Sequence, residues 1–393
     1  LYLPKIAFVH GGATIPVLLI KQKITICYLL SNLVVVIMSL TCNNNIINLP
    51  APPRQVEELD HFFEGAEKLL EVWFTSSTHE ILPSLGLRSI PRNELDDMLE
   101  LADCQIISCI SNKSMDAYVL SESSLFVSSQ RIILKTCGST KLMDTMGPIV
   151  ELANKYAGLN EIANVFYSRK NFSRPDLQPS LHRNFDAEIE HMDQFFENGA
   201  AYCMGRLNQE RWYLYTVCNP PIEEEPQRED QTLEILMSEL DPDAMDIFSK
   251  TRSNSSVEAR ALSGISKLFP PNTIIDDHLF DPCGYSMNGI LEGSDQYVTI
   301  HVTPEKEFSY VSYETNMDQS DMFQQTCRIL NCFKPKKFLM TLFANRSSRE
   351  GQKGQKALYD KIIPNYNRKD LQFLTLPDYT LVYAHYEIIA NTQ

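Results

Sequence analysis

From about residue 60 onward, apolar residues occur in short runs separated by polar turns, which is the pattern of hairpin-connected strands. The runs are rich in Val, Ile, Tyr and Phe, residues that favour strands. The run at 125–136 is expected to bend at Ser128-Ser129. The pattern predicts strands at 104–110, 116–120, 125–136, 161–168, 200–207, 212–217, 232–237, 274–280, 297–303, 308–314, 338–344, near 373, and at 381–389.

Helical periods are fewer. They predict helices at 93–102, 148–156, 185–196, 242–248 and 320–332. An acidic connector is expected at 220–231, a polar linker at 249–256, and a basic, glycine-containing loop at 345–356. Strands outnumber helices, which indicates an α+β protein with antiparallel sheets. The element order is similar in the two halves and suggests a duplicated half without a visible sequence repeat.

The segment HFFEGAEKLLEVWF, His61 to Phe74, fits two periodicities. A helix would place Glu64, Glu67 and Glu71 on one face. A strand beginning after Gly65 is favoured by the Val-Trp-Phe-Thr tail. Both faces of that strand carry apolar residues, so Glu67 and Glu71 are expected to face inward, where unpaired carboxylates are costly. A solvated edge strand is the alternative; a partly buried cation site is the functional interpretation.

A polar step at Leu120 to Ser124 divides two apolar runs within Tyr118 to Gly138, YVLSESSLFVSSQRIILKTCG. Taken alone, it is a hydroxyl-rich hairpin turn whose side chains bond their own backbone. A different signal stands near the N-terminus, where Ile24 to Leu40 is nearly uncharged and follows Lys21 and Lys23. That run is at the short limit for a membrane span and also fits a signal-peptide core. The alternative is that it is non-native, conceptually translated sequence.

Composition narrows the classes of function. With 44% hydrophobic and 22% charged residues the chain is globular in type. A net charge of −15 argues against a nucleic-acid-binding protein and is compatible with cationic ligands, although solubility alone explains many acidic proteins. The cysteines form no CxxC pair, and the pairs Cys104/Cys109 and Cys327/Cys332 lack histidines at zinc-ligand intervals. We expect reduced thiols and no metal site.

Several long motifs occur in order between about Asp60 and Tyr379: HFFEGAEKLLEVWF, YVLSESSLFVSSQRIILKTCG, FYSRKNF, NGAAYCMGR, DQTLEILMSELDP, DPCGYSMNG and YVTIHVTPEKEFSYVSYET. Together they resemble the eukaryotic S-adenosylmethionine decarboxylases of the putrescine-responsive animal type. The resemblance implies a four-layer αββα sandwich of two antiparallel sheets flanked by helices. It implies one domain over 60–393 behind a non-native or disordered extension at 1–59, a homodimer, a cytoplasmic location, and no membrane or nucleic-acid partner.

The resemblance further implies that S-adenosylmethionine is decarboxylated to S-adenosylmethioninamine, the aminopropyl donor for spermidine and spermine. This would proceed through a Schiff base with a pyruvoyl group made from Ser123. The chain would cut itself between Glu122 and Ser123 into a short β chain and a long α chain, after the Ser123 hydroxyl attacks the Glu122 carbonyl and the amide becomes an ester. Ser286 matches the group at the oxyanion, His301 the base at Cα, and Cys137 the later proton donor.

Without that context these residues are ordinary: Ser286 is a loop serine after a glycine turn, His301 a core histidine in a strand, and Cys137 a buried thiol. Two other functions stay open. One is a catalytically weak regulatory paralogue that pairs with an active decarboxylase subunit, against which the retained catalytic set argues. The other is a membrane-anchored protein that uses the same domain, which depends on Ile24 to Leu40 alone.

Substrate binding is also assigned by the resemblance. Aromatic faces attract a sulfonium and stack on adenine, whereas a carboxylate can take the ribose hydroxyls. The carboxylate of Glu67 is expected to lie between the active site and an activator site. The matching residues are Phe63 and Phe280 for adenine, Glu305 for ribose, Glu122 at the cleavage point, and Glu64 and Glu67 as further active-site carboxylates.

A second acidic group resembles the putrescine site of the animal enzymes. Carboxylates crowded between sheets repel one another unless a dication offsets them. Lys135 and Arg169 are expected to neutralise part of this charge, and Leu69 stands where plant members carry an arginine, which favours the diamine-responsive type. The matching residues are Glu71, Phe166, Ser168, Asp230, Thr232, Glu234, Glu314, Phe343 and Tyr379, of which 230, 232 and 234 alternate along one strand face.

Overall fold

The computed structural model describes residues 6–10, 13–17, 62–76, 85–218, 229–319 and 321–389. The chain divides into two units, Leu1–His61 and Phe62–Gln393. In the first unit, β1 (Ile6–His10) and β2 (Ala13–Val17) form an antiparallel pair. The apolar run at 24–40 and most of the acidic connector lie outside the described residues. Within the part that is described, no helix is both long enough and apolar enough to cross a membrane.

The second unit contains two eight-stranded antiparallel sheets, and the first has the order β4-β5-β6-β7-β3-β8-β10-β9. Helices α1 (Arg92–Leu101), α2 (Met146–Ala157) and α3 (Phe185–Met192) share an apolar core with one face of this sheet. The strands are β3 (Lys68–Thr75), β4 (Ile106–Ser111), β5 (Met115–Leu120), β6 (Ser123–Ser128), β7 (Arg131–Thr136), β8 (Glu161–Lys170), β9 (Ala200–Gly205) and β10 (Arg211–Cys218).

The second sheet has the order β12-β13-β14-β15-β11-β16-β18-β17. Helices α4 (Pro242–Asp246), α5 (Ser256–Ser263), α6 (Met322–Phe333) and α7 (Arg349–Asp360) contribute to the core on its outer face. Its strands are β11 (Gln231–Ser238), β12 (Thr273–Leu279), β13 (Tyr285–Leu291), β14 (Tyr297–Thr303), β15 (Tyr310–Thr315), β16 (Lys337–Asn345), β17 (Tyr366–Thr375) and β18 (Tyr379–Ile388). Short 3-10 turns are η1 (Gly86–Ser89), η2 (Leu142–Thr145), η3 (Pro175–Leu177), η4 (Ser180–Arg183) and η5 (Ile265–Lys267).

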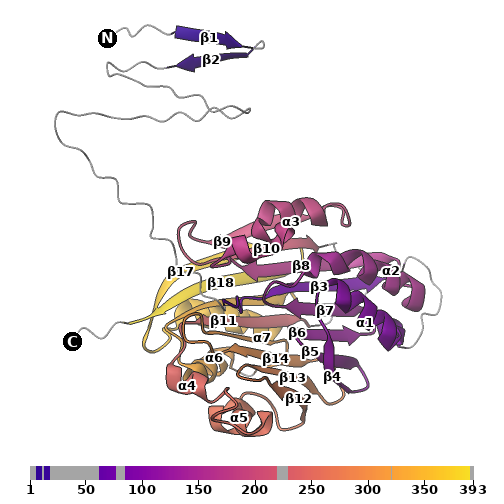
Figure 1. Ribbon diagram of the computed structural model, residues 1–393, viewed down its shortest axis with the longest axis vertical. Helices are drawn as coiled ribbons and strands as arrows, with labels where there is room; N and C mark the ends of the chain where they lie inside the picture. Colours follow the sequence, from indigo (N-terminus) through magenta and orange to yellow (C-terminus); the bar gives the residue numbers. More distant parts are fainter. Residues whose placement is uncertain are drawn as a thin grey trace, which may run out of the picture. The chain divides into compact units, whose positions relative to one another are not determined.

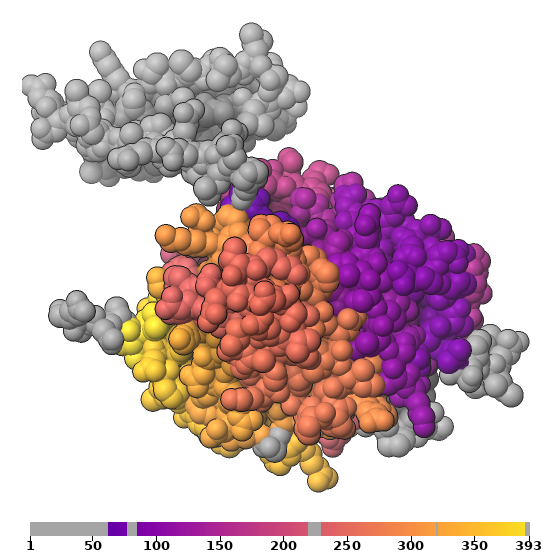
Figure 2. Space-filling model, turned by 60° about the horizontal axis from the view of Figure 1, so that its bottom comes forward, coloured from indigo at the N-terminus to yellow at the C-terminus, as the bar shows by residue number. Residues whose placement is uncertain are grey.

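The inner faces of the two sheets pack against each other (Figure 1). Leu214 and Trp212 of the first sheet share an inner core with Leu236, Leu339 and Leu381 of the second. In Figure 2 the earlier part of this unit, in purple, adjoins the later part, in orange, along a long seam. The layers are therefore helices, sheet, sheet and helices, which confirms the predicted αββα sandwich.

The two sheets also repeat one topology. If β3 to β10 are replaced in order by β11 to β18, the strand order of the first sheet becomes that of the second. The suggested duplication is thus present in the fold, although the two halves share no visible sequence repeat.

Strand β3 is an interior strand of the first sheet. It lies between β7 and β8, so the edge-strand alternative is wrong. Leu70, Val72 and Phe74 pack in the helix-side core, whereas Leu69 packs between the sheets. The carboxylate-bearing residues on that same inner face are buried, as the strand interpretation predicted; Glu71 is only 8% exposed.

Three local predictions are wrong. The run at 125–136 is a hairpin of β6 and β7 rather than one bent strand, and the supposed turn serine at 286 lies within β13. The expected loop at 345–356 contains most of α7, because its glycines serve close packing and not a turn. A Cβ on Gly351 would lie 2.6 Å from the Ala344 Cβ, and one on Gly354 2.5 Å from the Met322 sulfur. The polar linker at 249–256 leads into α5, which is capped by Ser255.

Candidate active site

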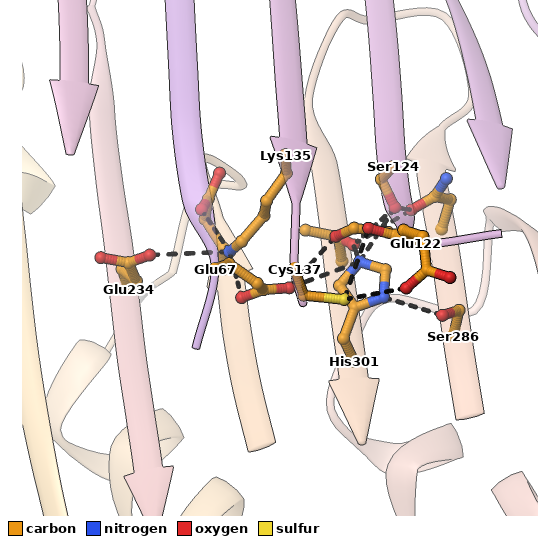
Figure 3. Close-up of polar contacts among 12 residues, drawn as sticks. Glu67, Glu122, Ser124, Lys135, Cys137, Glu234, Ser286 and His301 are labelled. Carbon is orange, nitrogen blue, oxygen red and sulfur yellow. Dashed lines mark hydrogen bonds and ion pairs between the residues drawn. The ribbon is translucent and has the colours of Figure 1, made fainter. Parts of the chain in front are cut away.

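A cleft of about 280 Å³ opens where the β5–β6 hairpin, the end of β7, the start of β13 and the end of β14 meet. Its wall brings together residues that are far apart in the chain, several of which are drawn in Figure 3. Most of the residues predicted for catalysis and substrate binding lie here: Phe63, Glu122, Ser123, Cys137, Phe280, Ser286, His301 and Glu305.

Ser123 is the first residue of β6 and is held in an unfavourable backbone conformation. The pairing of Leu120 with Ser123 leaves only Ser121 and Glu122 in the hairpin loop. Ser123 has φ +133°, a region that side chains other than glycine rarely adopt, so the backbone at this serine is strained. Its side chain is buried, and its Oγ donates a hydrogen bond to Glu67 Oε1 at 3.1 Å.

The carbonyl that precedes Ser123 is bound by Cys137. Ser123 pairs with Thr136 across β6 and β7, which places Cys137 opposite Glu122. The Cys137 amide donates to the Glu122 carbonyl oxygen at 3.0 Å, and its thiol lies 3.4 Å from the same oxygen. These donors stand where negative charge would develop if that carbonyl were attacked. The resemblance gave this position to Ser286, whose hydroxyl instead lies 2.9 Å from His301 Nδ1, because Ser286 and His301 pair directly across β13 and β14.

His301 is buried in the middle of β14. Its Nε2 lies 2.9 Å from both Ser124 Oγ and Thr299 Oγ1. Figure 3 labels Ser124 and His301. Burial, and secondly the positive charge of Lys135, hold the pKa of His301 well below its usual value. The imidazole is therefore neutral near pH 7 and able to accept a proton.

The Cys137 thiol holds its proton, whereas the His301 imidazole lacks a second one. Burial raises its pKa well above the usual value, and the nearby Glu122 and Glu67 raise it further. The sulfur thus keeps its proton and is suited to donate it rather than to act as a thiolate nucleophile.

The predicted substrate-binding residues are partly gathered in the cleft. Phe63 and Phe280 both line it, and Glu305 Oε2 is buried with no hydrogen-bond partner among the described residues. Glu64 does not line it: its carboxylate accepts the backbone amides of Ser173 and Arg174 at 3.0 to 3.1 Å and borders a neighbouring hollow. Glu64 thus lies beside the cleft with its carboxylate bound to the loop at 173–174, and its role as an active-site carboxylate stays a prediction.

A second, smaller cavity lies between the sheets and contains the acidic group singled out in the sequence. Lys135 Nζ lies 2.8 Å from Glu314, 3.4 Å from Glu67 and 3.6 Å from Glu234. Glu67 thus contacts both Ser123 and this cluster. The residues that line the cavity are Leu69, Glu71, Phe166, Ser168, Trp212, Leu214, Asp230, Thr232, Glu234, Glu314, Thr341, Phe343 and Tyr379.

The carboxylates of this cavity are hard to ionise together. Burial raises the pKa of Glu71 to about 7, against the effect of Arg131, while Asp230 and Glu314 add to the rise. Burial likewise raises the pKa of Glu234 to about 7, against the effect of Lys135. Lys135 itself stays charged: burial would lower its pKa, but the surrounding carboxylates raise it above its usual value.

Sequence reasoning placed one cation wrongly and missed another. Arg169 does not face the cavity; it forms a 2.8 Å ion pair with Glu188 on the helix side, because it alternates with the inward-facing Ser168 on β8. Arg131 takes part instead, 3.5 Å from Glu71. Its spacing two and four residues before Ile133 and Lys135 could have placed it on the inner face.

Several hydrogen-bond donors to the cluster were also missed. Trp212 Nε1 donates to Glu234 at 3.2 Å, Trp73 Nε1 to Glu71 at 2.7 Å, and the Tyr297 hydroxyl to Glu314 at 2.5 Å. Around His301, Asn288 and Thr299 were missed, although each is two residues from a predicted site residue on the same strand face. Among the described residues no group of His, Cys, Asp and Glu could hold a metal ion.

Comparison with known proteins places the chain. The family model for adenosylmethionine decarboxylase matches residues 60–387. An S-adenosylmethionine decarboxylase proenzyme of Caenorhabditis elegans is 50% identical over 358 residues, 90% of this chain and 96% of that protein. The proenzyme of Xenopus laevis is 47% identical, over 86% of this chain and 98% of its own length. A crystal structure of a Trypanosoma brucei AdoMetDC-delta26 monomer is 26% identical with a TM-score of 0.51, over 68% of this chain and 99% of that one.

The family match begins before the second unit and ends at residue 387, one residue before the end of β18. The fold and the residues of the cleft agree with this match. The chain belongs to the adenosylmethionine decarboxylase family.

Proposed function

We propose that this chain is an S-adenosylmethionine decarboxylase that makes its own pyruvoyl group from Ser123. The observation that carries the proposal is the setting of the Glu122–Ser123 peptide: a strained serine whose preceding carbonyl already accepts hydrogen bonds from Cys137.

Self-processing would start from the Ser123 hydroxyl. Its oxygen attacks the Glu122 carbonyl carbon while Glu67, the present acceptor of that hydroxyl, takes up the proton. The carbonyl oxygen becomes an oxyanion bound by the Cys137 donors. The carbon–nitrogen bond then breaks, the proton passes to the released nitrogen, and an ester joins Glu122 to the Ser123 side chain.

Elimination would complete the process. His301, which lines the same cleft as Ser123, takes the proton from the Ser123 Cα. The bond between Cβ and Oγ breaks, and Glu122 leaves as the C-terminal carboxylate of the short chain. The dehydroalanine at the new N-terminus reacts with one water and releases ammonia, which yields a pyruvoyl group at the start of the long chain.

The residues around Ser123 fit such a group, since the serine lies in the cleft wall beside a protonated thiol and a neutral imidazole. A pyruvoyl group supplies an electrophilic carbonyl and an electron sink for loss of carbon dioxide. Phe63 and Phe280 would hold the adenine and the sulfonium, and Glu305 the ribose. Cys137 would hold the proton that the substrate carbon needs after decarboxylation.

The cavity between the sheets would bind putrescine as an activator. Its carboxylates and the rings of Phe166, Phe343 and Tyr379 suit a short dication with an apolar middle. Glu67 and Lys135 connect it to Ser123, so charge introduced there would act on the same carboxylate that accepts the serine hydroxyl.

Location and assembly complete the proposal. We infer a cytoplasmic protein, which is supported by the free thiols of all the cysteines in the described part. We propose a homodimer of cleaved units, since the terminal strands β4, β9, β12 and β17 leave sheet edges for pairing. A weak regulatory paralogue is not favoured, because Ser123, Cys137, Ser286 and His301 meet in one cleft.

The activity is tested with substrate labelled in its carboxyl group. The unsubstituted chain should release labelled carbon dioxide, and Ser123→Ala should release none because no electrophile can form. Ser129→Ala changes an exposed serine of the same hairpin and should keep full activity. Activity in Ser123→Ala, or none in the unsubstituted chain after processing, would contradict the proposal.

A further inference from the structure

A buried group of polar side chains lies behind His301 and has no part in the steps above. It consists of Asn288 on β13, Thr299 on β14 and Ser124 on β6, each fully buried. One strand of the first sheet and two of the second thus bring these side chains together beside Nε2 of the imidazole. Because the group is buried, each of its hydroxyl, amide and ring protons needs an acceptor within it.

The orientation of the Asn288 amide follows from its partners. Asn288 Nδ2 donates to the Tyr118 carbonyl oxygen at 2.9 Å, so Oδ1 must face the other way. Oδ1 accepts the Ser124 hydroxyl at 2.6 Å and the Thr299 hydroxyl at 3.0 Å. A carbonyl oxygen cannot donate, so both hydroxyl protons are directed at Asn288.

This fixes the hydrogen on His301. Nε2 lies 2.9 Å from the oxygens of both Ser124 and Thr299, whose single protons are already used. An unprotonated Nε2 would set its lone pair against theirs, so Nε2 must carry the hydrogen and share it between them. Nδ1 is then bare and accepts the Ser286 hydroxyl at 2.9 Å.

The charged groups around the ring agree with this arrangement. Glu67 Oε1 lies 4.0 Å from Nε2, on the side of the N–H. Lys135, whose charge disfavours a second proton on the ring, is bound to that same carboxylate. A neutral imidazole carries one hydrogen on its two nitrogens, and the Ser124 and Thr299 oxygens favour Nε2 as its position.

We propose that Asn288 is a positioning residue that, through Ser124 and Thr299, holds neutral His301 in the Nε2–H tautomer and leaves Nδ1, beside Ser286, as its proton-accepting atom. This deepens the proposed function, because the base that removes the Ser123 Cα proton would then be Nδ1. It also accounts for the contact between Ser286 and His301, since the Ser286 hydroxyl donates to the ring nitrogen that carries no hydrogen.

The first test needs no substitution in this group. Nitrogen-15 NMR of histidine-labelled protein, kept uncleaved by Ser123→Ala, reports which ring nitrogen carries the proton, and His301→Gln identifies the signal. We expect a protonated Nε2 and a bare Nδ1. A proton on Nδ1 would overturn the proposal. Because this measurement uses uncleaved protein without substrate, it stands or fails separately from the proposed activity.

The second test moves the tautomer. In Asn288→Leu the hydroxyls of Ser124 and Thr299 lose their acceptor and turn toward Nε2, so the proton should move to Nδ1 and chain cleavage should slow by about tenfold or more. An unchanged tautomer would overturn the role of Asn288.

Thr299 gives a matched pair should Asn288→Leu fold poorly. Thr299→Val should weaken the preference for Nε2–H and slow cleavage, whereas Thr299→Ser keeps the hydroxyl and should restore both. Thr326→Val removes a buried hydroxyl from α6 and should change neither. Equal behaviour of the valine and serine variants at 299 would contradict the proposed relay.

Discussion

At the scale of single residues, Gly138 controls one wall of the cleft. It follows Cys137, has φ +61°, and its amide donates to the Glu64 carbonyl at 2.9 Å. A Cβ there would lie 2.7 Å from the ring of Phe63. The glycine therefore serves both the left-handed turn and the position of the ring expected to stack on adenine.

We predict that Gly138→Ala raises the KM for S-adenosylmethionine by roughly tenfold, as loss of one aromatic contact of about 1 to 1.5 kcal/mol would. The backbone strain alone should cost about 1 to 2 kcal/mol of stability. Steady-state kinetics on fully processed protein measures the first effect and chemical denaturation the second.

Gly293→Ala is the matched control. Gly293 also has a left-handed φ of +80°, but nothing lies within 4 Å of its Cβ position. It should show the loss of stability with an unchanged KM. A similar KM for both alanine variants would contradict the role given to the Phe63 contact.

The sequence could indicate individual site residues only where a motif or an alternation marked them. Ser286 was taken for a turn residue because a glycine precedes it, and the strand on which it faces His301 was not visible. Asn288 and Thr299 carry no signal of their own, since a buried Asn or Thr becomes informative only when its partners across three strands are known.

At the scale of elements, α3 is fixed to the first sheet by a buried carboxylate. Glu188 is fully buried and accepts from the Tyr167 hydroxyl at 2.7 Å and from Arg169 at 2.8 Å. His182 Nδ1 lies 2.7 Å from the same carboxylate. Such a pair is costly to break, because removal of one partner leaves the other charge buried.

We predict that Glu188→Ala lowers the free energy of unfolding by about 3 to 5 kcal/mol, measured by urea denaturation. Glu190→Ala, on the exposed side of α3, should change it by no more than about 0.5 kcal/mol. If both variants were equally stable, the Arg169–Glu188 pair would not anchor the helix.

Element types were predictable from periodicity where one face alone was apolar, as in α6. They were not predictable where packing reversed a local signal. The β6–β7 hairpin was predicted as one bent strand, because both of its strands are buried on both faces and show no alternation that would separate them. In α7 the glycines that indicated a loop allow the helix to approach β16 and α6.

At the scale of the whole molecule, the two sheets enclose carboxylates whose pKa values are raised by burial. Glu71 and Glu234 have pKa values of about 7, above the 4.5 of an unfolded chain. Between those values the folded state binds more protons than the unfolded state, so stability falls as pH rises from about 5 to 7. A dication bound between the sheets favours the ionised carboxylates and offsets this loss.

We therefore predict that putrescine binds more tightly as pH rises. Each carboxyl with a pKa near 7 should contribute up to roughly tenfold in affinity between pH 6 and pH 8, because the dication binds the ionised form. Calorimetric titration across that range gives the slope. Glu234→Gln should reduce both the affinity and the slope, and an affinity that does not change with pH would contradict the assignment of these carboxylates.

The central claim is that Ser123 is converted to a pyruvoyl group, and intact-mass spectrometry of the purified chain tests it most directly. The account predicts two polypeptides divided after Glu122, with the longer one lighter by one ammonia than a chain that begins with serine. A single uncut chain, or a longer fragment with an ordinary serine at its N-terminus, would contradict it.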